Sequence, residues 1–294
     1  MIRLGTRGSK LAMWQALHVQ TQLADAGQES SIVEISTVGD RVQNVPLHAI
    51  GVTGIFTKAL DDALEAKEID IAVHSAKDLP SKLDDRFEVA AFLKREDPRD
   101  VLVAVRPEVH FENLTSSWVI GTSSVRRQAL IKHYLPAIQL KDIRGNVDTR
   151  ISKLESGEYD GIMLAFAGLK RLGLERYVKQ KLNLATFTPA VGQGAIAVVA
   201  RKGSPHIEQL RSILHHLPTG IAVEAERSFL HTLEGGCHTP AFAFANVVGD
   251  NVSMTSGMAN KQGRIFRVED QSSAPDAVKM GEKLARQVLD YVNP

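Results

Sequence analysis

The chain has 294 residues, of which 44% are hydrophobic and 23% charged, and its 35 basic residues nearly balance 34 acidic ones. This composition is typical of a folded globular protein of about two or three domains. A formal net charge of +1 argues against wholesale binding to nucleic acid or an anionic membrane. One cysteine cannot form an intramolecular disulfide, and neither a signal peptide nor a transmembrane segment is evident, so we expect a cytoplasmic protein.

Short apolar strands alternate with amphipathic helices from the N-terminus onward, which is typical of α/β folds with mostly parallel sheets. Ala12, Ala16, Val19 and Leu23 are spaced four, three and four residues apart, so they form one face of a helix that Gly27 closes. The first predicted elements are a strand at 2–4, this helix, a strand at 31–37, a long loop at 39–54 and a strand at 69–73.

A second set of elements follows the polar, proline-containing link at residues 94–100. Its predicted members are strands at 101–105, 118–121 and 161–168, helices starting at Ser124 and Asn146, a glycine-rich crossing at 189–195 and a strand at 195–201. Two crossings between the sets predict a discontinuous first domain, a hinge and a ligand bound between two lobes.

The last part of the chain has a different pattern. Thr219 is a candidate cap for a helix that runs to Leu233, and antiparallel strands are predicted at 241–248, 252–259 and 264–270. A final helix places five apolar residues from Ala277 to Tyr291 on one face. These elements predict a small α+β domain.

Arginines gather at the starts of two predicted helices. Arg126 and Arg127 fall in the first turn after the capping residues 122–124, whereas Arg144 and Arg150 flank the start of the other helix. Helix N-termini attract anions and mildly disfavour cations, so this pattern indicates an anion held between the two ends. Guanidinium groups bind carboxylate or phosphate through two parallel hydrogen bonds. The alternative is a solvated helix face that binds nothing.

Asp78 directly follows a buried strand, at the end where open α/β sheets bind their ligands. A carboxylate in this place can act as an acid or base, or accept a hydrogen bond from a ligand N–H group. The alternative is an aspartate that only caps the turn before Leu79 and Pro80.

The single cysteine, Cys237, follows two glycines just past a predicted helix. A lone cysteine is by default a buried, inert apolar residue, but the glycine turn favours an accessible thiol. The ten histidines show no metal-site spacing, so no metal is expected. The segment 192–194 (Gly-Gln-Gly) is not a dinucleotide fingerprint, because a strand and not a helix follows it.

Together these motifs resemble the porphobilinogen deaminase (hydroxymethylbilane synthase) family. The matching segments occur in the family's order and cover residues 4–240; they are TRGSKLA, HSAKDLP, KREDPRD, GTSSVRRQ, RGNVDTR, SGEYDGIMLAFAGLKRLGL, PAVGQGA and LEGGC. The resemblance implies an α/β fold with two lobes similar to a type II periplasmic binding protein, plus a small α+β C-terminal domain. Domain 1 then comprises residues 1–95 and 193–215, domain 2 residues 99–189, and domain 3 residues 217–294.

The resemblance also implies a transferase of tetrapyrrole and haem biosynthesis. It condenses four porphobilinogen molecules head to tail, each losing ammonia, into hydroxymethylbilane. The growing chain is carried by a dipyrromethane cofactor, which a thioether joins to the cysteine that matches Cys237. The aspartate that matches Asp78 is catalytic, because it hydrogen-bonds pyrrole N–H groups and stabilises the cation formed at each step.

The family's remaining site positions fall on polar residues of this chain, which agrees with the acetate and propionate groups that every pyrrole ring carries. The cofactor-binding positions are Lys77, Asp78, Ser123, Ser124, Arg126, Arg127 and Arg150. The substrate-binding positions are Arg7, Ser9, Arg144, Arg150 and Arg171. The chain departs from the family at Ala49 and Thr53, where relatives usually carry lysines, and at 217–219, where they usually show Glu-Thr.

The rival hypothesis is a non-catalytic binding module with the same two lobes, which captures a small polycarboxylate. Cys237 and the third domain favour the enzyme, since a solute-binding module needs neither. A nucleic-acid role for the arginines ranks third because the net charge is close to zero. We therefore expect a monomer whose partner is porphobilinogen, with no nucleic acid and no membrane.

Overall fold

The computed structural model describes residues 1–36, 57–235, 239–260 and 262–292. Ala49, Thr53 and Cys237 lie outside these ranges. The chain divides into two compact units: Met1–Glu96 with Ala195–Gly220, and Asp97–Gly194 with Ile221–Pro294. The expected division into three domains is finer and stays a prediction. Within the described ranges, no helix is both long and apolar enough to cross a membrane.

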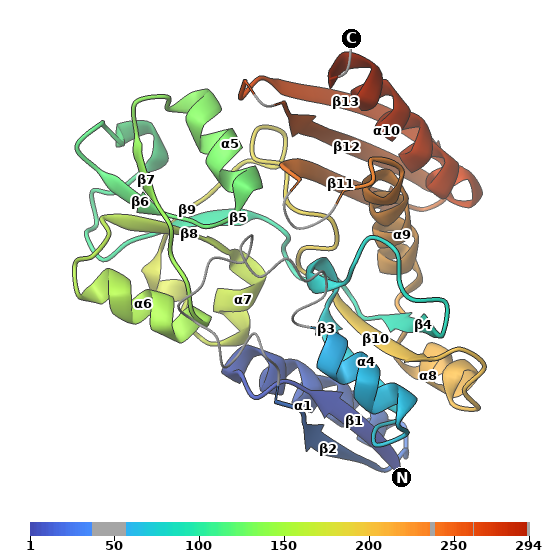
Figure 1. The fold of residues 1–294 in the computed structure, drawn as a ribbon. Helices are drawn as coiled ribbons and strands as arrows, with labels where there is room; N and C mark the ends of the chain where they lie inside the picture. The colour runs from blue at the N-terminus through green and yellow to red at the C-terminus, as the bar shows by residue number, and fades with distance from the viewer. Residues whose placement is uncertain (37–56, 236–238, 261, 293–294) are drawn as a thin grey trace. The chain divides into compact units, whose positions relative to one another are not determined.

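The first unit contains a five-stranded mixed sheet in the order β2-β1-β3-β10-β4 (Figure 1). Its elements are β1 (Ile2–Thr6), α1 (Lys10–Asp25), β2 (Ser30–Glu34), α4 (Lys58–Glu65), β3 (Ile71–Ser75), β4 (Phe87–Phe92), β10 (Ile196–Arg201) and α8 (Ile207–Leu214). Apolar residues of α1 and α8 form one core with the sheet. On Gly5, an added Cβ would lie 2.2 Å from Ile69 Cδ1 and 3.1 Å from Leu60 Cδ2, so the glycine leaves room beside β1 for Ile69 and for Leu60 of α4.

The second unit contains another five-stranded sheet, in the order β7-β6-β8-β5-β9. Its elements are β5 (Asp100–Val103), β6 (Val119–Gly121), α5 (Val125–Tyr134), β7 (Gln139–Lys141), α6 (Val147–Glu155), β8 (Gly161–Ala165), α7 (Phe166–Arg171) and β9 (Val178–Lys181). Residues of α5 contribute to one core cluster and residues of α6 and α7 to another, together with alternate residues of the sheet.

The two sheets share one topology. In each, three adjacent parallel strands are followed by one antiparallel strand, which is β10 in the first unit and β5 in the second. Both antiparallel strands come directly after a crossing between the units. The predicted α/β class with two lobes is therefore confirmed.

The second unit also holds a three-stranded antiparallel sheet formed by β11 (Ala241–Val248), β12 (Asn251–Ala259) and β13 (Ile265–Ser273). The helices α9 (Leu217–Thr232) and α10 (Ala277–Val292) contribute apolar residues to its core. This part has the α+β character predicted from its sequence.

The strands predicted at 31–37 and 101–105 are shorter in the structure, where they are β2 and β5. Two further differences have a clear physical reason. The strand predicted at 161–168 ends at Ala165, and α7 begins at Phe166. Because Phe166 and the next three residues are all buried, this apolar run shows no helical period. Helix α9 begins at Leu217, before Thr219, and His216 Nδ1 accepts the Thr219 N–H at 3.3 Å. A histidine therefore satisfies a free N–H of the first turn, in place of the predicted threonine cap.

Candidate functional site

The predicted site residues of the first unit follow two neighbouring parallel strands. Arg7 and Ser9 come after β1, whereas Lys77 and Asp78 come after β3, which pairs with β1. Because the carboxyl ends of parallel strands lie at the same edge of a sheet, the fold brings these four residues to one edge. This is the edge at which open α/β sheets bind ligands.

Local contacts fix the backbone at this edge. Ser9 is the N-cap of α1, and its hydroxyl accepts the Ala12 N–H at 3.3 Å. The Gln15 amide of α1 donates to Ser75 Oγ at 2.8 Å and so ties the helix to the end of β3. The second turn of α1 and the end of β3 are therefore held together, and Lys77, just after β3, is exposed to solvent.

Asp78 ends a short 3₁₀ turn, Ala76–Asp78, that follows β3. The Leu79 N–H closes this turn on the Ala76 carbonyl at 3.3 Å, so the turn is held by its backbone. The Asp78 side chain is half-buried, and its carboxylate makes no hydrogen bond or ion pair with the residues that the structure describes. The turn-capping interpretation thus finds no support, and the carboxylate can still accept a hydrogen bond from a ligand.

His74, four residues before Asp78, is 5% exposed, and its Nε2 has no hydrogen-bond partner in the described structure. Burial and, second, the positive charge of Arg7 lower the pKa of His74 to about 4. The imidazole is therefore neutral in the folded chain at pH 7. Because the charge of Arg7 acts on His74, Arg7 also contributes positive electrostatic potential at the sheet edge where Asp78 lies.

His74 makes the free energy of unfolding depend on pH. An unfolded histidine has a pKa near 6.5, so between pH 6.5 and 4 the unfolded chain binds more protons and stability falls as the pH falls. Between pH 7 and pH 4, we expect wild type to lose about 3 kcal/mol of unfolding free energy that His74→Phe retains. Urea titrations at each pH measure the difference, and parallel pH profiles for the two proteins would contradict it.

The predicted site residues of the second unit also gather at one edge of a sheet. Ser123, Ser124 and the two arginines after them follow β6, Arg144 follows β7, and Arg171 lies on α7 after β8. The strands β7 and β8 flank β6 and run parallel to it, so their carboxyl ends lie side by side. Asp100, the first residue of β5, lies at the same edge because it pairs with Ala165 at the end of β8.

Hydroxyl groups hold the start of α5 in place. Ser124 is the N-cap, and its hydroxyl accepts the Arg127 N–H at 3.4 Å. The Ser123 hydroxyl donates to the Ile143 carbonyl at 2.9 Å and accepts the Ile143 N–H at 3.0 Å. Both serines predicted to bind cofactor therefore also have structural partners, and Ser123 joins the two arginine-bearing loops.

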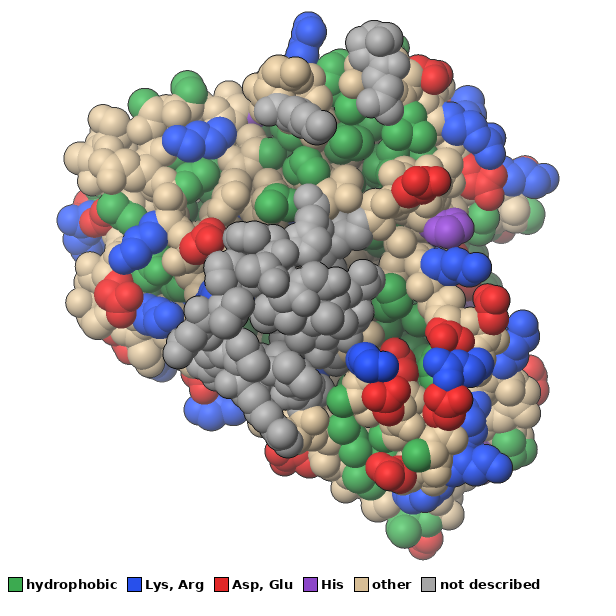
Figure 2. All heavy atoms as spheres, viewed as in Figure 1, with side chains coloured by type: hydrophobic (Ala, Val, Ile, Leu, Met, Phe, Trp, Pro, Cys, Tyr) green, Lys and Arg blue, Asp and Glu red, His purple; other side chains and the backbone are tan. Residues whose placement is uncertain are grey.

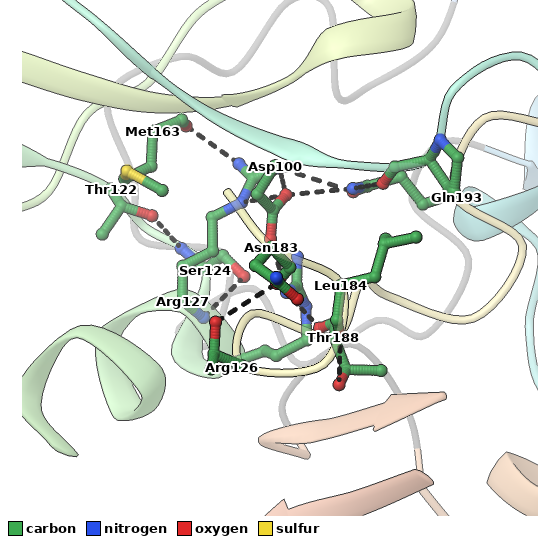
Figure 3. A network of polar contacts seen from close by, with 12 residues as sticks. Asp100, Thr122, Ser124, Arg126, Arg127, Met163, Asn183, Leu184, Thr188 and Gln193 are labelled. Atoms are coloured by element: carbon green, nitrogen blue, oxygen red, sulfur yellow. Dashed lines mark hydrogen bonds and ion pairs between the residues drawn. The ribbon is translucent and has the colours of Figure 1, made fainter. Parts of the chain in front are cut away.

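Arg126 and Arg127 point from the first turn of α5 to the carboxylate of Asp100 (Figure 3). The Arg126 Nη1 is 2.6 Å from Asp100 Oδ2, and the Arg127 Nη2 is 2.8 Å from Asp100 Oδ1. All three residues are buried, so the solvated-face interpretation is wrong for these two arginines.

The charges of this cluster do not cancel. Burial raises the pKa of Asp100, but the guanidinium groups of Arg126 and Arg127 outweigh burial and hold it well below its usual value. Asp100 is therefore ionised at pH 7, and two guanidinium groups with one carboxylate leave one positive charge. An anionic ligand can compensate that charge.

The other predicted arginines contact backbone oxygens. Arg150 Nε donates to the Gly145 carbonyl at 2.8 Å, and Arg171 Nη2 donates to the Gly194 carbonyl at 2.7 Å. Both side chains are partly exposed, as is that of Arg144. These two hydrogen bonds orient the guanidinium groups of Arg150 and Arg171 at the edge of the sheet.

Sequence reasoning missed four buried residues of this region, which are Asp100, Thr188, Gln193 and Glu226. The Glu226 carboxylate accepts the Gly192 N–H at 2.8 Å and the Ala245 N–H at 2.9 Å, so it joins the glycine-rich crossing to β11. Asp100 and Gln193 lie inside quoted motifs, but their partners are distant in sequence. A pattern read along the chain does not reveal such pairs.

Charges are mixed on the surface. On the face shown in Figure 2, acidic and basic side chains are interspersed over the described residues, without a patch of a single sign. This distribution agrees with the net charge of +1. The face in view offers no basic stripe of the kind that binds nucleic acid.

Comparisons with known proteins cover nearly the whole chain. The family model described as "Porphobilinogen deaminase, dipyromethane cofactor binding domain" matches residues 2–209, and "Porphobilinogen deaminase, C-terminal domain" matches residues 221–290. Relatives named porphobilinogen deaminase include one from Desulfosudis oleivorans, 42% identical over 98% of this chain and 94% of its own. Another, from Syntrophomonas wolfei, is 45% identical over 98% of this chain and 95% of its own.

Similar solved structures are more distant in sequence. The second substrate binding domain of a putative amino acid ABC transporter from Streptococcus pneumoniae has a TM-score of 0.46 and 15% identity, over 72% of this chain and 91% of that one. A nutrient binding protein from Burkholderia cenocepacia has a TM-score of 0.45 and 13% identity, over 71% and 90%. On the two family models and the sequence relatives, this chain belongs to the porphobilinogen deaminase family.

Proposed function

We propose that this chain carries out its family's reaction, the condensation of four porphobilinogen molecules into hydroxymethylbilane on a covalently bound dipyrromethane cofactor. Each condensation releases one ammonia, and water then releases the linear tetrapyrrole. Both family models match, and together they span residues 2–290 with a short gap. The protein is accordingly a transferase of tetrapyrrole biosynthesis.

The residues of the second unit fit a dipyrromethane group. Such a group carries carboxylates, and the cluster at the start of α5 keeps one uncompensated positive charge, with the Nε of Arg126 buried and without an acceptor. When bound, the group supplies the pyrrole carbon to which the first substrate is joined. Lys77, Asp78, Ser123, Ser124, Arg126, Arg127 and Arg150 are the residues that would hold it, and Cys237 is the residue that would bind it covalently.

The observation that carries the chemical proposal is the half-buried Asp78 carboxylate, which has no partner among the described residues. Porphobilinogen becomes positively charged as ammonia leaves its aminomethyl group. A carboxylate that accepts the pyrrole N–H stabilises this charge as it develops, which accelerates the step. Asp78 is therefore the catalytic residue, and the backbone-closed turn after β3 holds it in place.

Arginines would select the substrate through its carboxylates. Arg7 and Ser9 in the first unit, and Arg144, Arg150 and Arg171 in the second, are the proposed binding residues. A guanidinium binds a carboxylate through two parallel hydrogen bonds, which fixes the orientation of a bound ring as well as its charge. Neutral or monoanionic pyrroles would then bind less well than porphobilinogen.

Arg126 gives a direct test of this carboxylate recognition. Arg126→Leu is expected to lower the fraction of chains that carry the covalent cofactor, because the variant lacks the guanidinium that would bind a cofactor carboxylate. Arg126→Lys should rescue poorly, since a point charge cannot form two parallel hydrogen bonds. Intact-protein mass measures the loaded fraction, and equal loading of wild type and both variants would contradict the assignment.

We also propose a cytoplasmic monomer that acts on free porphobilinogen and binds neither nucleic acid nor membrane. The single cysteine and the small net charge support this proposal. Among the described residues, exposed large apolar side chains such as Leu17, Val105 and Val248 lie in separate segments. Scattered apolar residues are ordinary on a monomer surface.

The experiment that tests the proposed function is incubation with porphobilinogen as sole substrate. We expect one ammonia released for each porphobilinogen consumed, and a linear tetrapyrrole detected by mass. Consumption without a tetrapyrrole product would overturn the proposal.

A further inference from the structure

Two segments far apart in the sequence meet at Asp100. The chain enters the second unit at Asp97 and leaves it after Gly194. Gln193, next to the exit, donates from Nε2 to the Pro98 carbonyl at 2.6 Å and to Asp100 Oδ1 at 2.9 Å. The buried carboxylate of Asp100 is thus part of the contact that joins the entering and leaving segments.

The same carboxylate holds both arginines at the start of α5 (Figure 3). Asp100 Oδ1 accepts from Arg127 Nε at 3.0 Å and from Nη2 at 2.8 Å, and Oδ2 accepts from Arg126 Nη1 at 2.6 Å. The two arginines sit where the helix N-terminus disfavours cations. One internal anion therefore fixes two side chains that would otherwise repel each other.

The two guanidinium groups are used differently. In Arg127, Nε and Nη2 bind Asp100 and Nη1 donates to the Met163 carbonyl at 2.9 Å. In Arg126, Nη1 donates to Asp100 and to the Thr188 carbonyl at 2.9 Å. The Nε and Nη2 of Arg126, the pair with which Arg127 grips its carboxylate, make no hydrogen bond to any residue in the described ranges.

We propose that Asp100 is a positioning residue of the cofactor site, which holds Arg126 so that its Nε and Nη2 face a carboxylate of the bound dipyrromethane. It acts through Arg126 and does not itself touch the ligand. Through Arg127 and Gln193, it also fixes the start of α5 relative to the glycine-rich crossing. This inference rests on the proposed function, since it assumes that the anion is the cofactor.

The test compares the rate at which apoprotein gains the covalent mass of the cofactor when mixed with porphobilinogen, followed by intact-protein mass. Asp100→Asn keeps the size of the side chain but removes its charge, and so leaves two buried cations without an anion. Loss of one member of a buried ion pair has a large effect, and we expect loading to slow at least tenfold. Asp100→Glu, which keeps the charge, should restore part of the rate.

Two controls separate positioning from general loss of stability. Asp97→Asn removes the neighbouring carboxylate, which pairs with Arg99 and Lys181 and not with the α5 arginines, and should load at the wild-type rate. Ile138 is buried in the apolar core that also contains Leu130 and Ile131 of α5, and it makes no hydrogen bond to Arg126 or Arg127. Ile138→Ala therefore destabilises the second unit without changing the hydrogen-bond network. It should lower the melting temperature as Asp100→Asn does, yet load within about twofold of wild type.

If Asp100→Asn does not fold, Gln193→Met decides the question. It removes one hydrogen bond from an uncharged donor to Asp100 and one to the Pro98 carbonyl, and it leaves the ion pairs intact. We expect it to load about two- to tenfold more slowly than Ile138→Ala. Loading of either network variant at the Ile138→Ala rate would overturn the proposal. A wild-type protein that never gains the mass would instead overturn the proposed function, so the two failures are distinguishable.

Discussion

Asp78→Asn is expected to lower kcat by about 10²- to 10³-fold, with the fold and the covalent cofactor retained. The amide can still reach a pyrrole nitrogen, but it carries no negative charge to offset the cation that forms as ammonia leaves. The loss should appear in kcat more than in KM, because the missing interaction forms mainly in the transition state. Steady-state kinetics with porphobilinogen, on protein whose covalent mass has been verified, measure the effect.

A matched control for this variant is Asp85→Asn, in the loop that follows the same turn. The Asp85 side chain is 88% exposed, and among the described residues its ion pair is with the exposed Lys82 at 3.9 Å, so its loss should leave kcat unchanged. A change of less than threefold in Asp78→Asn would show that Asp78 does not stabilise charge in the reaction.

Cys237→Ala is expected to abolish activity and to reduce the intact mass to that of the bare sequence. The chain has one cysteine, so no other thiol can form the thioether. Before Cys237 the backbone turns at Glu234, whose φ of 52° lies in the left-handed region. This turn follows the end of α9, whose last residue is Thr232.

The controls for Cys237→Ala are its melting temperature and its reactivity with an acidic aldehyde reagent that colours pyrroles. The melting temperature should stay close to that of wild-type protein from which the cofactor is absent, whereas the colour should vanish. Full activity in this variant would mean that the cofactor is attached elsewhere or is not needed.

Much of the architecture could be predicted because it depends on local patterns. The alternation of strands and helices, the Ser124 cap and the change to antiparallel strands after residue 240 are all visible in short windows of sequence. The placement of Asp78 after a buried strand also follows from such a window. Parallel pairing then brings these strand ends together without further information.

The parts that could not be predicted depend on partners that are distant in the sequence. Nothing in the run VRRQ shows that Arg126 and Arg127 share a carboxylate 26 and 27 residues earlier in the chain. From the helix termini we predicted an anion held between the two arginine-bearing helix ends, which stays a prediction. The anion that the structure places on Arg126 and Arg127 is the Asp100 carboxylate. Helix α7 was missed for a related reason, because tertiary burial of its first four residues removes the polar face that marks a helix.

The central claim is that this chain builds a tetrapyrrole on a covalent primer, and the mass of the intact protein before and after exposure to porphobilinogen tests it most directly. The purified chain should carry an increment of two porphobilinogen molecules less two ammonia, which is absent from Cys237→Ala. With excess substrate, hydroxymethylbilane should appear in solution while the protein returns to that same mass. A chain that keeps its covalent group at saturating porphobilinogen yet releases no hydroxymethylbilane would contradict the account, and would favour a polycarboxylate-binding module instead.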